Sequence, residues 1–477
     1  LQHVKNYCGI MRESILWKSG FKLRNMILNG DISAVDLLES ILERIERINP
    51  DLNAVVTLNE DARKEAEEAD KLAKKGVEKP LLGVPLTIKD NICTRGLKTT
   101  YGSILYKDFI PGEDAIVVER VREAGAVIIG KTNLPEFGLV AITDNPLFGP
   151  TRNPWDRERT PGGSSGGSAV AVATGLGPIS IGNDGGGSIR IPASFCGVYG
   201  FKPSNGVVPN YPSLPLFIGL ATDGPITRYV IDAGLIMDVI SGPDYHDKST
   251  YGIPKMKFLD ELNKTVEDAK IAYSPDLGYA TVDPEIEEKV REAAFRFSEF
   301  GFEVEEIRLD IPNLENELTL KVIAEIYTFF RDRLEEWKMV AFKPYLTFLT
   351  MAEYITFSDY IRIMDKSNEL WLKMMGLFKS YDYLVTPTVA ITAFKIEDGM
   401  GPDSIAGKPI GPIGWMPFTY PFNFTGQPAA SIPVGLDKNG LPIGMQVVGR
   451  PYDDIGVLRL SKLYEERYSW HSLKPPI

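Results

Sequence analysis

The sequence predicts an α/β protein: a single compact domain in which a mixed central β-sheet is covered by helices on both faces. Short apolar runs with the length of buried strands recur along the chain, and stretches with apolar residues at helical spacing lie between them. Buried strands that alternate with helices indicate a sheet between two helical layers. No fixed-period repeat and no long linker interrupts the 477 residues, which favours one domain over residues 1–477.

The first elements along the chain are helical, over about residues 1–76. The segment that begins SAVDLLESILERIERINP carries apolar residues at helical spacing, with Ser33 as its N-cap and Asn49-Pro50 as its expected end. A second helix is expected from about Glu60 to Lys75, with alanines along one side and Gly76 at its end.

Strands are expected beyond Pro80, in a core that extends over about residues 80–240 and returns near the C-terminus. A helix is expected over 284–300, and residues 310–380 form a more helical and aromatic segment. The expected strands are VPLTI (84–88), AVIIG (126–130), PISIG (178–182), FEVEEIRL (302–309), YLVT (383–386), AASIPV (429–434) and IGMQVVG (443–449).

The composition excludes several classes of protein. Hydrophobic residues make up 44% and charged residues 24%, which is a globular balance and not that of a disordered or fibrous chain. The 52 basic and 64 acidic residues give a net charge of −12, opposite to the basic surplus of a nucleic-acid binder. No apolar run reaches about 18 residues, and no signal-peptide pattern opens the sequence. We therefore expect a cytoplasmic protein with a small-molecule partner, without nucleic acid or membrane.

Cysteine and histidine are too scarce for several kinds of site. A disulfide framework and a cysteine-rich zinc site are excluded, and a Ser-His-Asp triad has few candidates for its base. No metal or organic cofactor is implied. These isolated residues are Cys8, Cys93, Cys196, His3, His246 and His471.

The densest motif is PGGSSGGS, residues 161–168, which leads into the small-residue helix pattern AVAVATG. A flexible loop is the simple interpretation, and the helix pattern favours a packed turn instead. A phosphate-binding loop is the third interpretation, because glycine-rich turns before helices expose N–H groups. Neither GxxxxGK[ST] nor GxGxxG in its strand–helix setting is present, which argues against nucleotide binding.

A second glycine cluster, DGGGSIR, occupies residues 184–190. Gly185, Gly186 and Gly187 allow successive backbone N–H groups to face one point, as an oxyanion hole requires. Ser188 beside them is then a candidate nucleophile. The alternative is a glycine turn with an incidental serine.

A serine nucleophile needs a base, and Lys89 is the candidate. It ends the expected strand 84–88, where burial would lower its pKa and leave a neutral amine. Most lysines are solvated surface groups, so this residue alone is weak support.

Together these segments resemble the amidase signature family, which carries a lysine in a KD motif, a serine in GGSSGG and a serine in GGS[IV]R. Lys89, Ser164 and Ser188 occupy those places. The similarity continues in KTNLPEFG (131–138), FGPTRNPWD (148–156), DGPITR (223–228), LVTPT (384–388) and the C-terminal FTYPFNFTGQPAASIPVG and GLPIGMQVVGRP. It covers most of the chain from about residue 30 and is interrupted mainly over 245–375.

The resemblance implies an amidase that hydrolyses the C–N bond of a carboxylic amide through a Ser-Ser-Lys triad. Ser188 would form the acyl-enzyme, Ser164, behind a cis peptide bond from Gly163, would relay protons, and Lys89 would be the base. Backbone N–H groups of residues 185–188 would hold the oxyanion. Asp184 and Arg190 would brace the loop, and a homodimer is the assembly that the resemblance suggests.

One departure favours a branch of the family. Many A subunits of tRNA-dependent amidotransferases have DTGGS where this chain has DGGGS, and a GTYALS-like stretch that this chain lacks. A stand-alone amidase is therefore favoured, with the glutaminase subunit of a tRNA-dependent glutamyl or aspartyl amidotransferase as the alternative and a silent scaffold as the third.

The substrate pocket is expected from residues 205–220 and 310–380. An apolar acyl group is one interpretation of the aromatic and methionine residues in the second segment, and ordinary core packing is the other. These residues are Tyr327, Phe329, Phe330, Trp337, Trp371, Met374 and Met375.

Overall fold

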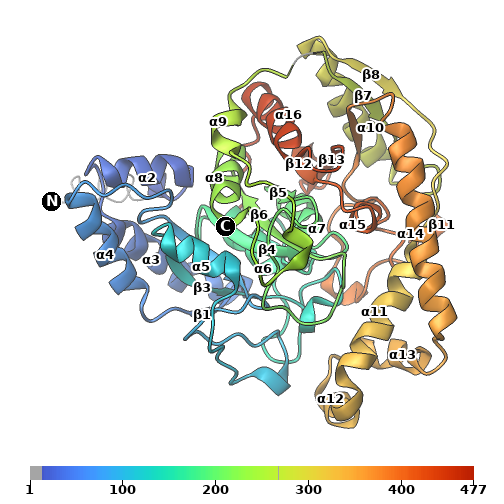
Figure 1. Ribbon diagram of the computed structural model, residues 1–477, viewed down its shortest axis with the longest axis horizontal. Helices are drawn as coiled ribbons and strands as arrows, with labels where there is room; N and C mark the ends of the chain where they lie inside the picture. Colours follow the sequence, from blue (N-terminus) through green and yellow to red (C-terminus); the bar gives the residue numbers. More distant parts are fainter. Residues whose placement is uncertain (1–12, 267) are drawn as a thin grey trace.

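The structure, a computed structural model, describes residues 13–266 and 268–477, and it is built around one eleven-stranded sheet (Figure 1). The sheet is mixed, as the sequence predicted: β2 is parallel to β3 and β4, β7 is parallel to β8 and β9, and the remaining pairs are antiparallel. In spatial order the strands are β1 (Val55–Leu58), β3 (Val127–Thr132), β2 (Pro85–Lys89), β4 (Ile179–Asp184), β6 (Thr222–Thr227), β5 (Tyr199–Lys202), β12 (Ala429–Leu436), β13 (Pro442–Val448), β9 (Tyr383–Pro387), β7 (Lys270–Tyr273) and β8 (Glu303–Glu306). A separate small hairpin pairs β10 (Ser404–Ile405) with β11 (Lys408–Pro409).

Helices cover both faces of the sheet. One face is covered by α5 (Ile116–Glu123), α8 (Val230–Ile240), α10 (Pro284–Phe295) and α16 (Asp454–Arg467). The other is covered by α4 (Ala62–Lys74), α6 (Gly166–Ala173) and α7 (Arg190–Cys196), with α3 (Ala34–Leu52) packed on α4. The remaining helices are α2 (Gly20–Leu28), α9 (Phe258–Leu262), α11 (Glu315–Phe330), α12 (Leu334–Val340), α13 (Lys343–Ala352), α14 (Phe357–Leu377) and α15 (Pro421–Phe424).

Alternation along the strands explains the two layers. In β3, Ile128 packs into the core under α5 and α8, whereas Val127 and Ile129 pack into the core under α4 and α6. Successive side chains of a strand point to opposite faces, so a fully apolar strand serves two cores at once. This is why most of the predicted strands are largely apolar; β8, a strand at the edge of the sheet, is mostly exposed and is the exception.

The end of α3 differs from the prediction. The sequence places its end at Asn49-Pro50, but the helix continues through Pro50 to Leu52. Proline lacks only its own N–H, and here it lies in the last turn, where little helix follows. The Asn49 side chain accepts from the N–H groups of Ala54 and Val55 at 2.9 Å each, so it fastens the chain after the helix and does not end the helix itself.

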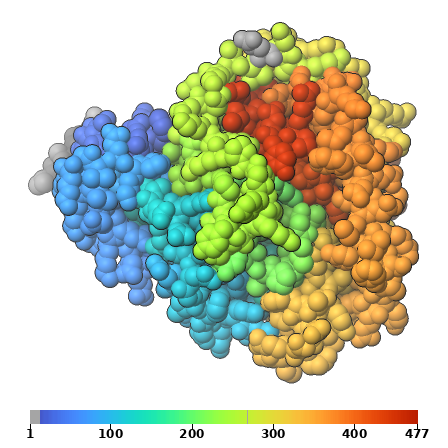
Figure 2. Space-filling view, viewed as in Figure 1, coloured from blue at the N-terminus to red at the C-terminus, as the bar shows by residue number. Residues whose placement is uncertain are grey.

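Helices α11–α14 form an arm at one side of the molecule, where residues 310–380 are gold to orange in Figure 2. This agrees with the helical segment that the sequence predicted there. The expected helix over 284–300 is α10 followed by a 3₁₀ turn at Arg296–Phe300. Within the described residues, no helix is both long and apolar enough to cross a membrane.

Candidate active site

The candidate site lies at the end of the sheet where the carboxyl termini of two neighbouring parallel strands, β2 and β4, lie side by side. Lys89 is the last residue of β2 and Asp184 the last residue of β4. Ligands of α/β proteins bind at the carboxyl ends of parallel strands. Both glycine motifs lie at this end of the sheet. Ser164 lies in the turn before α6, and Ser188 lies in the turn between β4 and α7.

Lys89 and Ser164 are in direct contact. Lys89 Nζ is 2.6 Å from Ser164 Oγ and 3.3 Å from the carbonyl oxygen of Asn183, and the side chain is fully buried. Burial lowers the pKa of Lys89 to about 7, although the carboxylates of Asp184 and Asp223 act in the opposite direction. A large fraction of this amine is therefore neutral near pH 7, which is the form that accepts a proton.

The two serines line one cavity. The peptide bond between Gly163 and Ser164 is cis. The N–H of Ser165 donates to the carbonyl oxygen of Ser188 at 3.1 Å, which ties the two glycine loops together. Ser188 is 9% exposed, and no residue in the described part of the chain forms a hydrogen bond with its Oγ. The hydroxyl is thus left available to a molecule in the cavity.

The backbone of the second glycine loop is closely packed. A Cβ on Gly187, whose φ is +129°, would lie 2.3 Å from Thr419 Oγ1. The Gly187 N–H donates to Asp184 Oδ1 at 2.8 Å, so it is occupied, contrary to the expected role as an oxyanion donor. The amides of Gly185, Gly186 and Ser188 have no acceptor among residues 13–266 and 268–477. The set of donors free to face a substrate therefore narrows to these three.

A buried ion pair holds this loop. Arg190 contacts Asp184 through two hydrogen bonds of 2.9 and 3.0 Å, and both side chains are fully buried. Burial alone would raise the pKa of Asp184, but the charge of Arg190 and its hydrogen bonds hold that pKa well below its usual range. Asp184 therefore stays ionised, and its contact with Arg190 braces the loop, as expected. Its other partners are Thr419, Asn423 and Gln446, which receive hydrogen bonds of 2.6–2.8 Å from Arg190.

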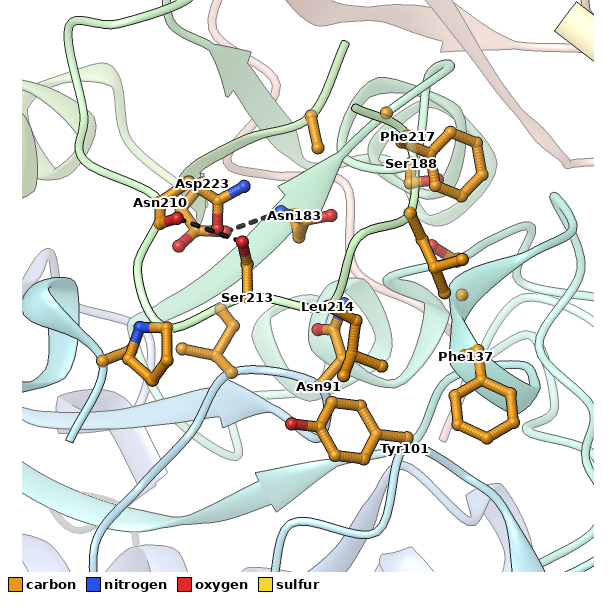
Figure 3. Close-up of a pocket in the computed structure, with 18 residues that line it drawn as sticks. Asn91, Tyr101, Phe137, Asn183, Ser188, Asn210, Ser213, Leu214, Phe217 and Asp223 are labelled. Carbon is orange, nitrogen blue, oxygen red and sulfur yellow. Dashed lines mark hydrogen bonds between the residues drawn. The ribbon is translucent and has the colours of Figure 1, made fainter. Parts of the chain in front are cut away.

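Ser188 lies between two cavities, one polar and one apolar, and it lines both of them. Gly138 and Phe217 also line both cavities. The first, the polar cavity, is drawn in Figure 3. Its further lining residues are Asn91, Ile92, Tyr101, Ala115, Phe137, Ser164, Asn183, Gly185, Asn210, Pro212, Ser213, Leu214, Leu216, Ala221 and Asp223.

The second, the apolar cavity, lies between Ser188 and the helical arm. It holds about 990 Å³ of space, including its opening to solvent. Its further lining residues are Leu139, Val140, Ala141, Gly186, Leu318, Thr319, Val322, Ile323, Ile326, Trp337, Tyr345, Phe348, Leu349, Met400, Pro412, Ile413, Trp415 and Met416. Residues from 205–220 and 310–380 thus line the two cavities, and their role as the substrate pocket stays a prediction.

One buried carboxylate fastens the arm to the core. Glu136 accepts from Ser103 Oγ at 2.6 Å on the core side, and from Trp337 Nε1 at 3.1 Å and the Phe342 N–H at 2.8 Å on the arm side. Its carbonyl oxygen accepts from Tyr345 Oη at 3.0 Å. Trp337 and Tyr345 are walls of the apolar cavity, so Glu136 fixes their position.

The aromatic residues singled out in the arm are mostly not cavity walls. Trp337 lines the apolar cavity, and Phe330 stacks behind it with ring centroids 4.4 Å apart. Met374 is buried in the core, and Trp371 is partly exposed on α14. The ordinary packing interpretation therefore holds for most of that set.

The histidines lie elsewhere. His246 stacks on Tyr211 and pairs with Asp244, and His471 lies beside Tyr229 and Glu465. Neither lines either cavity. His3 and Cys8 lie outside the described residues.

Sequence reasoning missed Asn183, Asp223 and Glu136 as parts of the site. Asn183 lies one residue before the glycine loop DGGGSIR, and Asp223 is the first residue of the DGPITR motif. Glu136 stood in KTNLPEFG. Each is a polar residue beside a glycine or proline, either in a family motif or, for Asn183, directly before one, and this was the sign that the sequence offered.

Comparison with known proteins agrees with this geometry. The sequence model of the Amidase family matches residues 36–458. An acylamidase of Rhodococcus erythropolis is 34% identical over 469 residues, which are 97% of this chain and 98% of that protein. The A subunit of the glutamyl-tRNA(Gln) amidotransferase of Sulfurihydrogenibium sp. is also 34% identical, over 97% of this chain and 100% of that protein. The crystal structure of a bacterial aryl acylamidase of the amidase signature family superposes with a TM-score of 0.90 at 32% identity, covering 96% of this chain and 97% of the other.

The fold, the glycine loops and these likenesses define an amidohydrolase. The chain belongs to the Amidase family, whose members are the amidase signature enzymes. It is an enzyme that hydrolyses amide bonds.

Proposed function

We propose that this enzyme is a stand-alone amidase that cleaves carboxylic amides with Ser188 as nucleophile, Ser164 as proton relay and Lys89 as base. The observation that carries the proposal is the 2.6 Å contact between Lys89 Nζ and Ser164 Oγ, made by a fully buried lysine. A lysine without a carboxylate contact in a buried site is held partly neutral, and a neutral amine can take a proton from a hydroxyl.

The proposed reaction has two halves. Ser188 Oγ attacks the carbonyl carbon while its proton passes to Ser164 Oγ, and the proton of Ser164 passes to Lys89 Nζ. The free amides at Gly185, Gly186 and Ser188 stabilise the oxyanion. When the C–N bond breaks, the proton returns through Ser164 to the leaving nitrogen. Water, activated by the same relay, then cleaves the ester and releases the carboxylate.

The second candidate is the glutaminase component of a tRNA-dependent amidotransferase, because the amidotransferase relative is as similar in sequence as the acylamidase. Glutamine carries an α-carboxylate, which binding sites commonly hold with a guanidinium or an ammonium. No arginine or lysine is among the described residues that line either cavity. This absence of a cationic partner favours amides without a carboxylate.

The test uses the purified chain alone. We expect it to hydrolyse simple acyl amides without tRNA or a second protein, and to be labelled at Ser188 by a fluorophosphonate. Glutamine should be a poor substrate. Release of ammonia from glutamine that appears only after a partner protein is added would support the second candidate instead.

A further inference from the structure

The relation between the two cavities and the proton relay orients the substrate. Ser164 lines the polar cavity and is absent from the walls of the apolar cavity, whereas Ser188 lines both. In the proposed function, on which this inference rests, Ser164 returns the proton to the leaving nitrogen. The nitrogen must therefore face the polar cavity. The acyl substituent lies on the other side of the carbonyl carbon and therefore enters the apolar cavity, which Ser188 also lines.

The polar cavity offers hydrogen-bond acceptors that the protein does not use. Asp223 accepts from Asn183 Nδ2 at 2.7 Å through Oδ1, and Oδ2 accepts nothing from the described residues. Asn91 Oδ1 is buried without a partner. Asn183, Asp223, Asn210 and Ser213 lie together on one side in Figure 3, with Ser188 and Phe217 on the other.

We propose that the polar cavity is a recognition site for the amine half of the substrate, and that Asp223 selects amines that carry a second, positively charged amino group. A molecule of this class places the scissile nitrogen at Ser164 and its ammonium at Asp223.

Charge and burial support this choice of ligand. Asp223 is 3% exposed, and no arginine or lysine is among the described residues that line the cavity with it, although the nearby Lys89 acts on its charge from outside the cavity lining. A largely buried carboxylate whose second oxygen opens into the cavity without a partner among the described residues is poorly compensated, and an ammonium is the ligand that compensates it most. Tyr101 and Phe137 add aromatic walls, which also attract cations.

The experiment compares two substrates that share one apolar acyl group, an N-(2-aminoethyl) amide and an N-propyl amide. At pH 8 the side amine is protonated. Asp223 is ionised there, because burial raises its pKa only to about 6 against the opposing effects of Asn183 and Lys89. We expect kcat/KM of the wild-type enzyme to favour the aminoethyl amide at least about tenfold, and Asp223→Asn to bring the ratio close to one.

The ratio separates recognition from catalysis. An effect of Asp223→Asn on the basicity of Lys89 acts on both substrates and cancels in the ratio. Asp260→Asn is the matched control, because it makes the same change at an exposed carboxylate that lines neither cavity, and it should leave the wild-type ratio unchanged. Affinities of the two amides for the Ser188→Ala protein, measured by calorimetry, should show the same preference without turnover.

The outcomes are distinct. A wild-type ratio near one, or a preference that persists in Asp223→Asn, overturns the recognition site while the proposed function stands. Failure of the wild-type enzyme to hydrolyse either amide, together with absent labelling of Ser188, contradicts the proposed function itself.

Discussion

The two cavities beside Ser188 are built from different parts of the chain. The polar cavity is formed by loops at the ends of interior strands of the sheet. Its polar side chains, and Lys89 beside it, are held in place by strands β2, β4 and β6. The apolar cavity takes much of its wall from α11–α13, an arm outside the sheet. Under the proposed function, reaction chemistry and acyl selection therefore lie on separate structural units. The family motifs cluster in the first unit, and the similarity that the sequence shows is interrupted in the second.

The two units differ in how they are fastened. The loop at Ser188 is held by the buried pair of Asp184 and Arg190 with many backbone partners, whereas the arm is fastened beside the site by hydrogen bonds to Glu136. We therefore expect changes in the first unit to affect every substrate, and changes in the second to depend on the acyl group.

The largest effect is expected from the relay itself. Ser188→Ala removes the proposed nucleophile and Lys89→Ala removes the proposed base, so kcat should fall by about three orders of magnitude or more for all acyl groups. Lys89→Arg should not restore activity, because a guanidinium stays protonated. Steady-state kinetics on small and bulky amides checks this. Near-normal turnover by Lys89→Ala would rule out this base.

The pH dependence of the rate sharpens the same point. Since the pKa of Lys89 is lowered from 10.5 to about 7, its active neutral form increases as pH rises through 7. The rate should therefore rise about tenfold per unit below pH 7 and level off above about pH 8.

Lys202 provides the control for that limb. Burial and the neighbouring Arg190 lower the pKa of this lysine also to about 7, but its Nζ donates to the carbonyl oxygen of Pro203 and it lines neither cavity. Lys202→Met should leave the midpoint of the limb near 7. A midpoint that shifts in the Lys202→Met variant would assign the pH limb to Lys202 instead of Lys89.

Glu136→Gln tests the fastening of the arm. An amide cannot accept from Ser103, Trp337 and Phe342 together, so Trp337 or the backbone at Phe342 loses its fixed position. We expect kcat/KM for amides with bulky apolar acyl groups to fall about tenfold, with acetamide changed less than about threefold. Glu335→Gln, an exposed change on α12, is the control and should alter neither. An equal loss on both substrates would place Glu136 with the relay instead.

A change in the wall of the apolar cavity should have a similar direction and a smaller effect. Val322→Trp fills space beside Leu318 and Ile323, so amides with bulky acyl groups should lose several-fold in kcat/KM while acetamide keeps its rate. A size series of acyl groups measures this. Loss that does not depend on acyl size would contradict the assignment of this cavity to the acyl group.

The smallest effect is expected at the histidines. His246→Ala and His471→Ala should keep kcat within a few-fold, because neither side chain lines a cavity at Ser188. An inactive histidine variant that still folds, by circular dichroism, would reopen the question of the base.

The difference between the units also explains what the sequence could predict. Seven of the eleven strands of the sheet were predicted, six of them to within two residues at each end, because burial on both faces leaves a largely apolar run. The predicted strand 302–309 ends three residues beyond β8, and β1, β5, β6 and β7 were not predicted. The predicted end of α3 was wrong, because the Asn49 side chain binds the backbone that follows the helix and does not terminate the helix. That contact is a tertiary detail that local preference does not contain.

Within the candidate site, the family motifs pointed to Lys89, Ser164 and Ser188, which the structure brings together, but not to their neighbours. The use of the Gly187 amide by Asp184 depends on how a four-residue turn folds. Asp223 joins the site from β6, which pairs with β4, and Glu136 reaches the arm across more than 200 residues. Composition and spacing do not record such long-range meetings.

The partners of Arg190 have a consequence for how the enzyme is made. Its hydrogen bonds to Thr419, Asn423 and Gln446 span 229, 233 and 256 residues, and β5 pairs with β12 across a similar length of chain. During synthesis, the lysine and both serines emerge long before these partners do. Until then Arg190 lacks the carbonyl and amide oxygens that hold it, and β5 lacks its neighbour. Hydrolytic activity should therefore appear only when the last strands have left the ribosome, so that a prematurely terminated chain carries the whole relay and yet remains inert.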